Sequence, residues 1–472
     1  MLFPLLTLSA STRKVAVSRD FTALSGFFVS SFLYFNGDIS LKSVKIGLCG
    51  LGTVGSSTFN VMVRNSDEIS SRAGCQITVA QVGARRDHPA CDLRDVAVSR
   101  DIFEVVDNAD IDIIVELIGG TTVAKEVVER AIANGKHVVT ANKALIAEFG
   151  NDIFAAAQKQ GVTIAYEAAV AGGIPIIKAL REGLAANRIE WLAGIINGTG
   201  NFILTEMADK GRDFVDVLKE AQALGYAEAD PTFDIEGIDA AHKLVILASL
   251  AFAMPLQYNK VFTEGISCIE TKDIDYAKKL GYHIKHLGIA RRVGESIELR
   301  VHPTLIPEKR LIANVNGVMN AIVIKGDAVG PTLYCGAGAG AEPTASAVIA
   351  DIVDIARQIS RDSQPSIPSL GFNEVSDKPL RSIADVQTAY YLRVLVEDKP
   401  GVLSQITTIL SEAGISVEAM QQSEPEEGEV LAEVVVVTNR VQQQHLLGAV
   451  NRIETLASIH GNVHKIRVES LG

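Results

Sequence analysis

The sequence predicts an α/β protein: a Rossmann-type doubly wound parallel sheet, an α+β domain for substrate binding and dimerisation, and a C-terminal ferredoxin-like (βαββαβ) unit. Three observations support this fold class. Short apolar runs alternate with helical patterns over 44–140, which is typical of a parallel sheet covered by helices. An acidic segment at 225–239 leads into a very apolar helix. The last part of the chain alternates strand and helix patterns in the order βαββαβ.

Length and composition exclude several classes of protein. The chain has 472 residues, 47% of them hydrophobic, which suggests two or three folded domains and excludes wholesale disorder. Its formal net charge of −12 argues against nucleic acid as a partner, because phosphate binding favours a basic surface. The 5 cysteines have no C-x-x-C spacing and so predict neither a zinc site nor a disulfide framework. We therefore expect a cytoplasmic protein.

Residues 1–42 form an N-terminal extension whose pattern fits no standard targeting signal. Its longest apolar run, 21–35, is shorter than the ~20 residues that a membrane-spanning helix needs. That run follows the basic residues and ends in Leu33-Tyr34-Phe35, unlike the small-residue end of a secretory signal. We interpret the extension as disordered or non-native, with a weak targeting peptide as the alternative, and expect no membrane association.

A nucleotide-binding pattern begins at the predicted strand 44–49. The run Gly50-Leu51-Gly52-Thr53-Val54-Gly55 follows this strand and leads into a predicted helix at 56–64. In a dinucleotide fold these glycines permit the tight turn, the approach of the pyrophosphate and the packing of helix on strand. The alternative is a glycine-rich turn between two buried elements.

The elements that follow support the nucleotide-binding interpretation. Strands are predicted at 77–82, 111–118 and 137–140, and a helix is predicted at 122–134. The second strand ends Gly83-Ala84-Arg85-Arg86, without the acid that usually binds the ribose 2′-hydroxyl of NAD. Guanidinium groups at this position would pair with a 2′-phosphate. We expect NADP, with NAD possible and a solvated pair of arginines as the alternative.

Two lysines are candidates for the chemistry. Lys143 follows the strand 137–140, so it should point into the ligand crevice at the carboxyl ends of the strands. Lys243 directly precedes the apolar stretch 244–252 and lies four residues after Asp239, so on one helix the two share a face. A buried lysine requires a partner or a function. The alternatives are a solvated lysine at 143 and a surface ion pair at 239 and 243.

A third polar segment, Tyr166–Pro175, contains Glu167 among small residues. Small residues allow backbone carbonyls to converge, and ligands that are all oxygen select hard cations over zinc. A tight turn between a strand and a helix would give the same sequence.

These segments, with Gly198-Thr199-Gly200-Asn201-Phe202 between them, resemble homoserine dehydrogenase over residues 43–360. The resemblance implies interconversion of L-homoserine and L-aspartate 4-semialdehyde with NAD(P), in threonine, methionine and isoleucine biosynthesis. It implies an acid/base role for Lys243 and contact of Lys143 with substrate and nicotinamide. It also implies that Asp239 is a catalytic residue and that Glu228 and Asp234 bind the substrate in the same site. The implied sodium ligands are Glu167 and the carbonyls of Val170, Gly172 and Ile174. The implied cofactor-binding residues are Gly50, Gly52, Thr53, Val54, Gly55, Arg85, Arg86, Lys143 and Gly340.

The C-terminal unit resembles an ACT domain. Strands are predicted at 391–396, 415–421, 430–438 and 463–468, helices at 402–413 and 441–453, and an acidic hairpin at 423–429. One face of its sheet should be available for pairing, so a homodimer or homotetramer is expected. The resemblance implies L-threonine as the effector, whereas the alternative is an inert dimerisation unit.

We therefore divide the chain into an extension at 1–42, a Rossmann domain at 43–167, a substrate domain at 168–330, a return to the Rossmann domain at 331–360, a linker at 361–388 and the ACT domain at 389–472. Two competing functions remain. An NADP(H)-binding redox sensor would not need Lys243 and Asp239. A related amino-acid dehydrogenase with another substrate would share the nucleotide-binding half but would not explain the acidic segment 225–239.

Overall fold

The computed structural model describes residues 43–363, 367–423 and 430–472, and the expectations for 1–42 and for most of the acidic hairpin lie outside these residues. Its first sheet is parallel and has the strand order β3-β2-β1-β4-β5-β6. The strands are β1 Ser43–Cys49, β2 Gln76–Gly83, β3 Ala97–Ser99, β4 Ile113–Glu116, β5 His137–Thr140 and β6 Ile164–Ala165. This order reverses at β1 and β4, where a doubly wound fold binds its ligand. The predicted fold class is confirmed.

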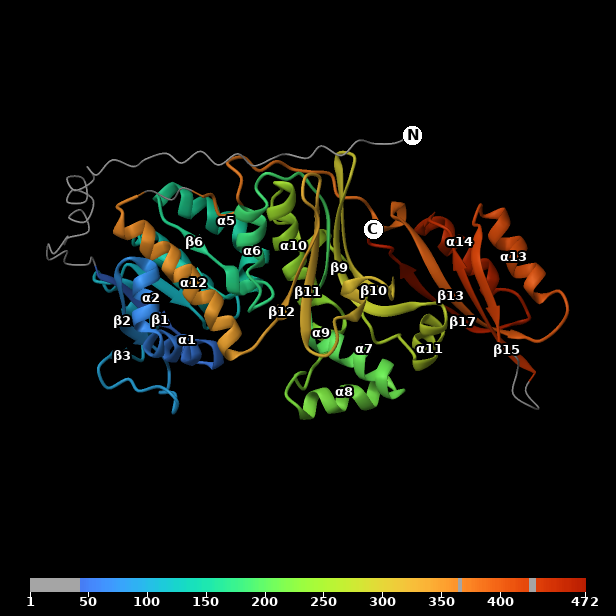
Figure 1. Cartoon of the computed structure of the whole chain (residues 1–472), viewed down its shortest axis with the longest axis horizontal. Helices are drawn as coiled ribbons and strands as arrows, with labels where there is room; N and C mark the ends of the chain where they lie inside the picture. The colour runs from blue at the N-terminus through green and yellow to red at the C-terminus, as the bar shows by residue number, and fades with distance from the viewer. Residues whose placement is uncertain (1–42, 364–366, 424–429) are drawn as a thin grey trace, which may run out of the picture. The chain divides into compact units, whose positions relative to one another are not determined.

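Helices cover both faces of this parallel sheet. They are α1 Thr53–Arg64, α2 Ser66–Ala73, α3 Ile102–Asp107, α4 Val123–Ala133, α5 Lys143–Gln160 and α12 Ala341–Ser360. The chain returns to this sheet late, because α12 packs beside α1, and Figure 1 shows this orange helix among the blue and teal elements. An ion pair between Arg64 and Glu342 joins the two helices.

The middle of the chain builds a second, mixed sheet. Its strands are β7 Ile189–Ile195, β8 Phe262–Thr263, β9 Tyr282–Val293, β10 Ser296–Pro307, β11 Met319–Gly326 and β12 Gly330–Ala337. Helices α6 Ile176–Lys178, α7 Gly198–Lys210, α8 Phe214–Ala223, α9 Thr232–Ile235, α10 Ile238–Phe252 and α11 Thr271–Lys279 accompany them. Every residue of α10 from Asp239 to Phe252 is buried. Burial is expected for the apolar stretch 244–252, and it places the charged side chains of Asp239 and Lys243 inside the fold as well.

The C-terminal module has the predicted βαββαβ order. It consists of β13 Gln387–Glu397, α13 Val402–Glu412, β14 Val417–Gln422, β15 Leu431–Thr438, α14 Gln443–Glu454 and β17 Ile459–Val468, with the short β16 Val441–Gln442. The strand order β17-β13-β15-β14 is that of a ferredoxin-like sheet. Its two helices enclose a core that includes Leu392, Ile406 and Leu446.

The module's sheet continues the second sheet. Strand β17 pairs in parallel with β10 through Thr304↔Arg467 and Leu305↔Val468. The face expected to be available for pairing packs partly within the same chain, because Tyr391 and Ile466 share a core with Ile274 of α11. The module is therefore joined to the substrate domain by both an edge and a face.

The segment 361–388, predicted as a linker, contacts the rest of the chain over its described residues. Tyr166 donates its hydroxyl to Ser369 O at 2.6 Å, and Ile297 N–H donates to Pro379 O at 2.9 Å. Leu370 is buried in the large core that also contains α10. These contacts fix the path between the substrate domain and the C-terminal module.

Candidate active site

The glycine-rich turn has the backbone geometry that a dinucleotide requires. Gly50 has φ of +103°, a region that favours glycine, and a Cβ on Gly55 would lie 2.0 Å from Gly50 O. A Cβ on Gly52 would contact nothing within 4 Å, so this residue faces open space. Thr53 and Val54 begin α1, whose first turn contains no acidic residue. The helix N-terminus is thus suited to a pyrophosphate.

The turn opens into a cavity of about 1000 Å³ at the carboxyl ends of β1, β2 and β4. Gly50, Gly52 and Gly119 line this cavity together with Arg85 and Arg86, and both arginines are exposed. The pattern of the residues fits a dinucleotide cofactor. It places two guanidinium groups where the second strand ends, as the sequence predicts.

A buried acid that sequence reasoning missed shapes the cavity wall. Glu116 is 0% exposed at the end of β4, and its carboxylate accepts hydrogen bonds from the N–H groups of Ile118 and Gly119 and from the Thr140 hydroxyl. An acid inside the otherwise apolar predicted strand 111–118 was the available signal. Glu116 holds the 117–120 loop beside the glycine-rich turn.

The two candidate lysines meet at one carboxylate. Asp239 contacts Lys243 Nζ at 2.7 Å through Oδ2 and Lys143 Nζ at 3.0 Å through Oδ1. Lys143 comes from the start of α5, beside the nucleotide-binding sheet, whereas Lys243 and Asp239 lie on α10. Lys243 also donates to Ile196 O at 2.7 Å. The structure therefore assembles this cluster from two domains.

In this cluster two ammonium groups contact one carboxylate, and the surroundings shift the pKa of Lys243 and of Asp239. Burial lowers the pKa of Lys243, and the nearby Lys143 ammonium lowers it further, while Asp239 opposes the shift. Burial alone would raise the pKa of Asp239, but attraction to the two ammonium groups holds it below its usual range. Lys243 is thus an ammonium that can release its proton more readily than an ordinary lysine.

Asn197 connects the cluster to Asp234, and sequence reasoning missed it. Its Nδ2 donates to Asp234 Oδ1 at 2.7 Å and to Asp239 Oδ2 at 2.9 Å. Its Oδ1 accepts from Gly200 N–H at 2.7 Å and so caps α7. An asparagine before a glycine-rich helix start is a common N-cap, so the local sequence indicates the cap but not the contacts with the two carboxylates. Burial raises the pKa of Asp234, and the hydrogen bond from Asn197 opposes this shift.

Glu228 lies apart from these contacts. Glu228 is exposed, and its backbone carbonyl accepts a hydrogen bond from Gln222 Nε2 at 3.1 Å. Its segment lies between α8 and the short helix α9, which carries Asp234. The structure thus brings together four of the five predicted substrate and catalytic residues and leaves this one at the rim.

The predicted sodium ligands lie in one tight turn. Glu167 is 2% exposed, and its two carboxylate oxygens each accept one N–H, from Ile177 and Lys178, at 2.8 Å. Burial and the neighbouring Asp351 raise the pKa of Glu167 to about 7. Ile174 O already accepts from Ile176 N–H at 2.7 Å. A carboxylate has about four lone-pair positions, so the donor set still fits a hard cation.

Gly340 caps the start of α12 with φ of +128°. The loop before it packs on the same tight turn: Gly173 N–H donates to Ala337 O at 2.9 Å, and a Cβ on Gly172 would lie 2.7 Å from Gly338 O. The glycines of this loop therefore permit a close backbone approach between the returning chain and the substrate domain.

Comparison with known proteins agrees with this arrangement. The homoserine dehydrogenase NAD-binding domain matches residues 50–167, the homoserine dehydrogenase family matches 175–353, and the ACT domain matches 390–457. Homoserine dehydrogenase of Pseudomonas aeruginosa is 61% identical over 433 residues, covering 91% of this chain and 100% of that protein. That of Neisseria gonorrhoeae is 52% identical, with the same coverage.

Solved structures give the same result. A homoserine dehydrogenase from Thiobacillus denitrificans has a TM-score of 0.87 at 57% identity, covering 91% of this chain and 99% of that one. A hyperthermophilic archaeal homoserine dehydrogenase mutant, solved in complex with NADPH, has a TM-score of 0.56 at 27% identity and covers 66% of this chain and 97% of that one. Within the part of the chain that the structure describes, no helix is long and apolar enough to cross a membrane. The chain belongs to the homoserine dehydrogenase family and carries a C-terminal ACT domain.

Proposed function

We propose that Lys243 is the acid/base group of the homoserine dehydrogenase reaction and that Lys143 stabilises the negative charge on the reacting oxygen. The observation that carries this proposal is the Asp239 carboxylate, which holds both ammonium groups within 3.0 Å. In the oxidation of L-homoserine, the substrate hydroxyl gives its proton to neutral Lys243. The carbon-bound hydrogen leaves with its electron pair, and the bound nicotinamide supplies the acceptor. In the reverse direction Lys243 donates this proton to the aldehyde oxygen.

Asp234 and Glu228 suit the ammonium group of the substrate. Asp234 is held by Asn197 at the edge of the lysine cluster, and Glu228 lies on the flanking exposed segment. Binding the ammonium group here would direct the other end of the substrate toward Lys243. NADP as the preferred cofactor is supported by Arg85 and Arg86 in the nucleotide cavity, with NAD as the alternative.

The test is NADP-dependent oxidation of L-homoserine by the purified chain, measured as reduced nicotinamide formed. The wild type should oxidise L-homoserine, and the Lys243→Ala variant should do so more slowly by roughly 10²–10⁴-fold, while both bind NADPH. An NADP(H) sensor would bind the cofactor without turning over homoserine. A related amino-acid dehydrogenase would turn over another amino acid faster.

Regulation by L-threonine is the second part of the proposal. Helix α13 begins after Gly401, with no acidic residue in its first turn, and Asp398 in the preceding turn accepts from Gln422 Nε2 at 3.0 Å. The N–H groups at this helix start suit an amino acid's carboxylate. Threonine should inhibit the wild type on the scale of ~5–150-fold, which is typical of allosteric coupling. Unchanged rates at millimolar threonine would make the module a dimerisation unit.

The sodium ion and the oligomer are also proposals. Glu167 with the carbonyls of Val170, Gly172 and Ile174 would hold sodium, and this predicts that sodium raises the melting temperature of wild type but not of Glu167→Gln. Exposed apolar side chains on the outer strands of the second sheet, Met319 and Leu333, support a homodimer or homotetramer. Light scattering would give the mass of the assembly.

A further inference from the structure

The loop between β8 and α11, residues 264–270, is bound by the C-terminal module at both of its ends. Glu264 Oε2 accepts from Arg467 Nη1 at 2.9 Å, and Glu270 Oε2 accepts from Arg393 Nη2 at 2.7 Å. Arg467 lies on β17 and Arg393 on β13, and they are 4% and 6% exposed. Two buried arginines of the module thus fix the start and the end of this loop.

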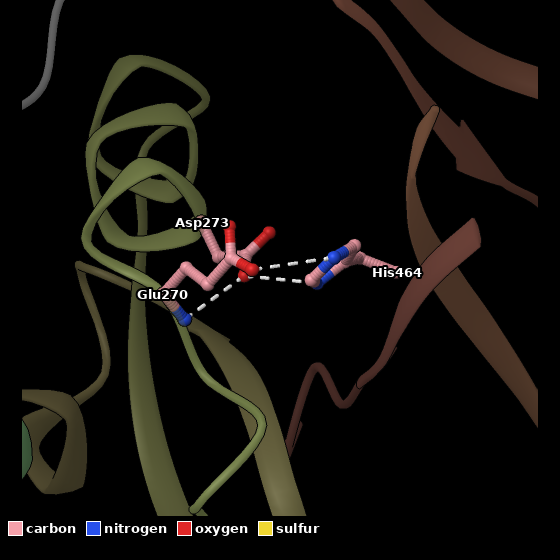
Figure 2. Close-up of side chains that lie close together, drawn as sticks. All are labelled: Glu270, Asp273 and His464. Carbon is pink, nitrogen blue, oxygen red and sulfur yellow. Dashed lines mark hydrogen bonds and ion pairs between the residues drawn. The ribbon is translucent and has the colours of Figure 1, made fainter. Parts of the chain in front are cut away.

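The contact at the loop's end is a salt-bridge joint. Glu270 and Asp273 form the capping box that begins α11, and Arg393 Nε donates to Asp273 Oδ1 at 2.7 Å. Figure 2 shows both carboxylates turned toward His464 of β17, at 3.4 and 3.7 Å. Among the described residues, these three side chains are the group spaced to hold a metal ion. The Arg393 guanidinium already bonds both carboxylates, so the cluster joins two elements rather than binding a cation.

The middle of the same loop contacts the active site. Ile266 N–H donates to Ile235 O at 2.9 Å, and the Ser267 hydroxyl donates to Glu236 Oε1 at 2.8 Å. Ile235 and Glu236 directly follow Asp234. The Ile266 side chain is fully buried and lies against the first turn of α7, where a Cβ on Gly200 would be 3.6 Å from its Cδ1. The loop therefore contacts both elements that hold Asp234 and Asn197.

Helix α9 needs such support, because its own hydrogen bonds are few. It has four residues, Thr232–Ile235, and it ends beside Gly237, whose φ is +83°. A single helical turn is marginal without tertiary contacts. The two hydrogen bonds from the 264–270 loop supply contacts at the end of α9 that lies next to Asp234.

We infer that the 264–270 loop is a positioning element of the active site, through which the C-terminal module sets the placement of Asp234. This inference rests on the proposed role of Asp234 in binding the substrate's ammonium group. Displacing either arginine anchor would shift the loop, and Ile266 and Ser267 would carry that shift to α9. The expected consequence is a change in homoserine affinity, with cofactor affinity unchanged.

The first test is a Ser267→Ala variant of the full-length protein. Loss of one hydrogen bond should raise the KM for L-homoserine by about 3-fold, with kcat and the KM for NADP unchanged. Ser267→Thr keeps the hydroxyl and should restore the wild-type KM. The control is Ser363→Ala, which removes another exposed hydroxyl, bonded to Gln358 O, far from the loop in sequence. A homoserine KM for Ser267→Ala equal to that of the control overturns the inference.

The second test is a double-mutant cycle, because spatial proximity alone does not establish coupling. Arg393→Lys keeps the charge of the module's anchor but loses the guanidinium fork that bonds Glu270, Asp273 and Glu433. It should raise the homoserine KM, and in the Ser267→Ala background its effect should be smaller by about 2-fold or more. Arg452→Lys, at an exposed pair with Glu412, is the matched control. Effects that multiply independently overturn the inference.

Two further variants keep the outcomes distinguishable. If Arg393→Lys fails to fold, His464→Gln replaces it, with exposed His445→Gln as its control. Asp234→Asn tests the underlying assignment. A raised KM in Asp234→Asn with none in Ser267→Ala refutes the loop alone, whereas an unchanged KM in Asp234→Asn refutes the role of Asp234.

Discussion

Two buried charge clusters in this chain differ in how directly their charges are paired. In the active site, Asp239 faces two lysines, and the pKa of Lys243 is lowered by burial and by Lys143. Where β10 meets the module, Arg300 contacts Glu469 at 2.5 Å and Glu298 at 3.4 Å, and Arg291 contacts Glu469 at 2.9 Å. In this second cluster two arginines face two glutamates.

The way in which acids and bases are paired decides what each cluster can do. Although burial opposes both shifts, the pKa of Arg300 is raised and Arg300 and Arg291 lower the pKa of Glu469 to about 2. Arg300 therefore stays protonated and Glu469 stays ionised at any working pH. A partly open cluster in which two ammonium groups share one carboxylate can exchange a proton, whereas a closed cluster of directly paired arginines and glutamates can only hold two elements together.

The largest expected effect is on catalysis. Lys243→Ala should lower kcat by roughly 10²–10⁴-fold, because it removes the group that takes the hydroxyl proton. Lys243→Arg should be nearly as inactive, since a guanidinium keeps the charge but cannot release its proton. Stopped-flow or steady-state kinetics measures the turnover of both variants, and a parallel NADPH titration measures their cofactor binding. Substantial turnover in the arginine variant would mean that a positive charge alone suffices, and it would contradict proton exchange as the distinguishing property of this cluster.

The second effect is on stability. Glu469→Gln should destabilise the chain by about 3 kcal/mol, because lowering this pKa from 4.5 to about 2 corresponds to about 1.36 kcal/mol per pKa unit. The contribution is fully present above pH 4.5 and is lost as pH falls toward 2. Urea unfolding of both proteins at several pH values measures it. If the difference in unfolding free energy between the two proteins does not shrink as the pH falls, the loss of stability would be due to packing and not to charge.

Deleting the module should destabilise the catalytic part for the same reason. Removal of residues 389–472 takes Glu469 away from Arg300 and Arg291 and uncovers the apolar core that Tyr391 and Ile466 share with Ile274. Arg300→Met in the truncated chain should recover part of the melting temperature. If the truncated chain melts like the full-length protein, the β10–β17 joint contributes little.

Exposed arginines provide the third test. Replacing Arg85 and Arg86 with alanine should lower kcat/KM for NADP relative to NAD by about 10-fold or more, since charge-assisted hydrogen bonds of this kind contribute ~1.5–3 kcal/mol each. The measured quantity is the ratio of kcat/KM for the two cofactors. An unchanged ratio would mean that these arginines are solvated and do not bind the 2′-phosphate.

The smallest effect is a shift in pH dependence. Lys143→Gln removes the like charge that lowers the pKa of Lys243, so this pKa should rise. Oxidation needs neutral Lys243, and its pH–rate profile should move to higher pH by up to about one unit. The variant's lower kcat does not affect the midpoint. A midpoint equal to that of wild type would show that the two lysines are not coupled.

Local patterns predicted much of this arrangement. The strand–glycine–helix order identified the nucleotide-binding turn, although α1 begins at Thr53 rather than at 56. The four-residue spacing of Asp239 and Lys243 indicated their contact, because residues at this spacing share a helix face. Asn197 was missed because an N-cap has a sufficient local explanation, and nothing in the local sequence reveals that its amide also faces two carboxylates.

The sequence by itself determined the Rossmann order, the ferredoxin-like module and the buried lysine, because periodicity, glycine positions and helix spacing act over a few residues. Only the tertiary structure decided which distant groups meet. Lys143 reaches Asp239 from another domain, Glu116 shapes the 117–120 loop, and Glu469 neutralises Arg300 across a strand pair formed by Thr304↔Arg467 and Leu305↔Val468. Such pairings depend on how sheets are joined and faces are covered, and these choices leave no local signal in the chain.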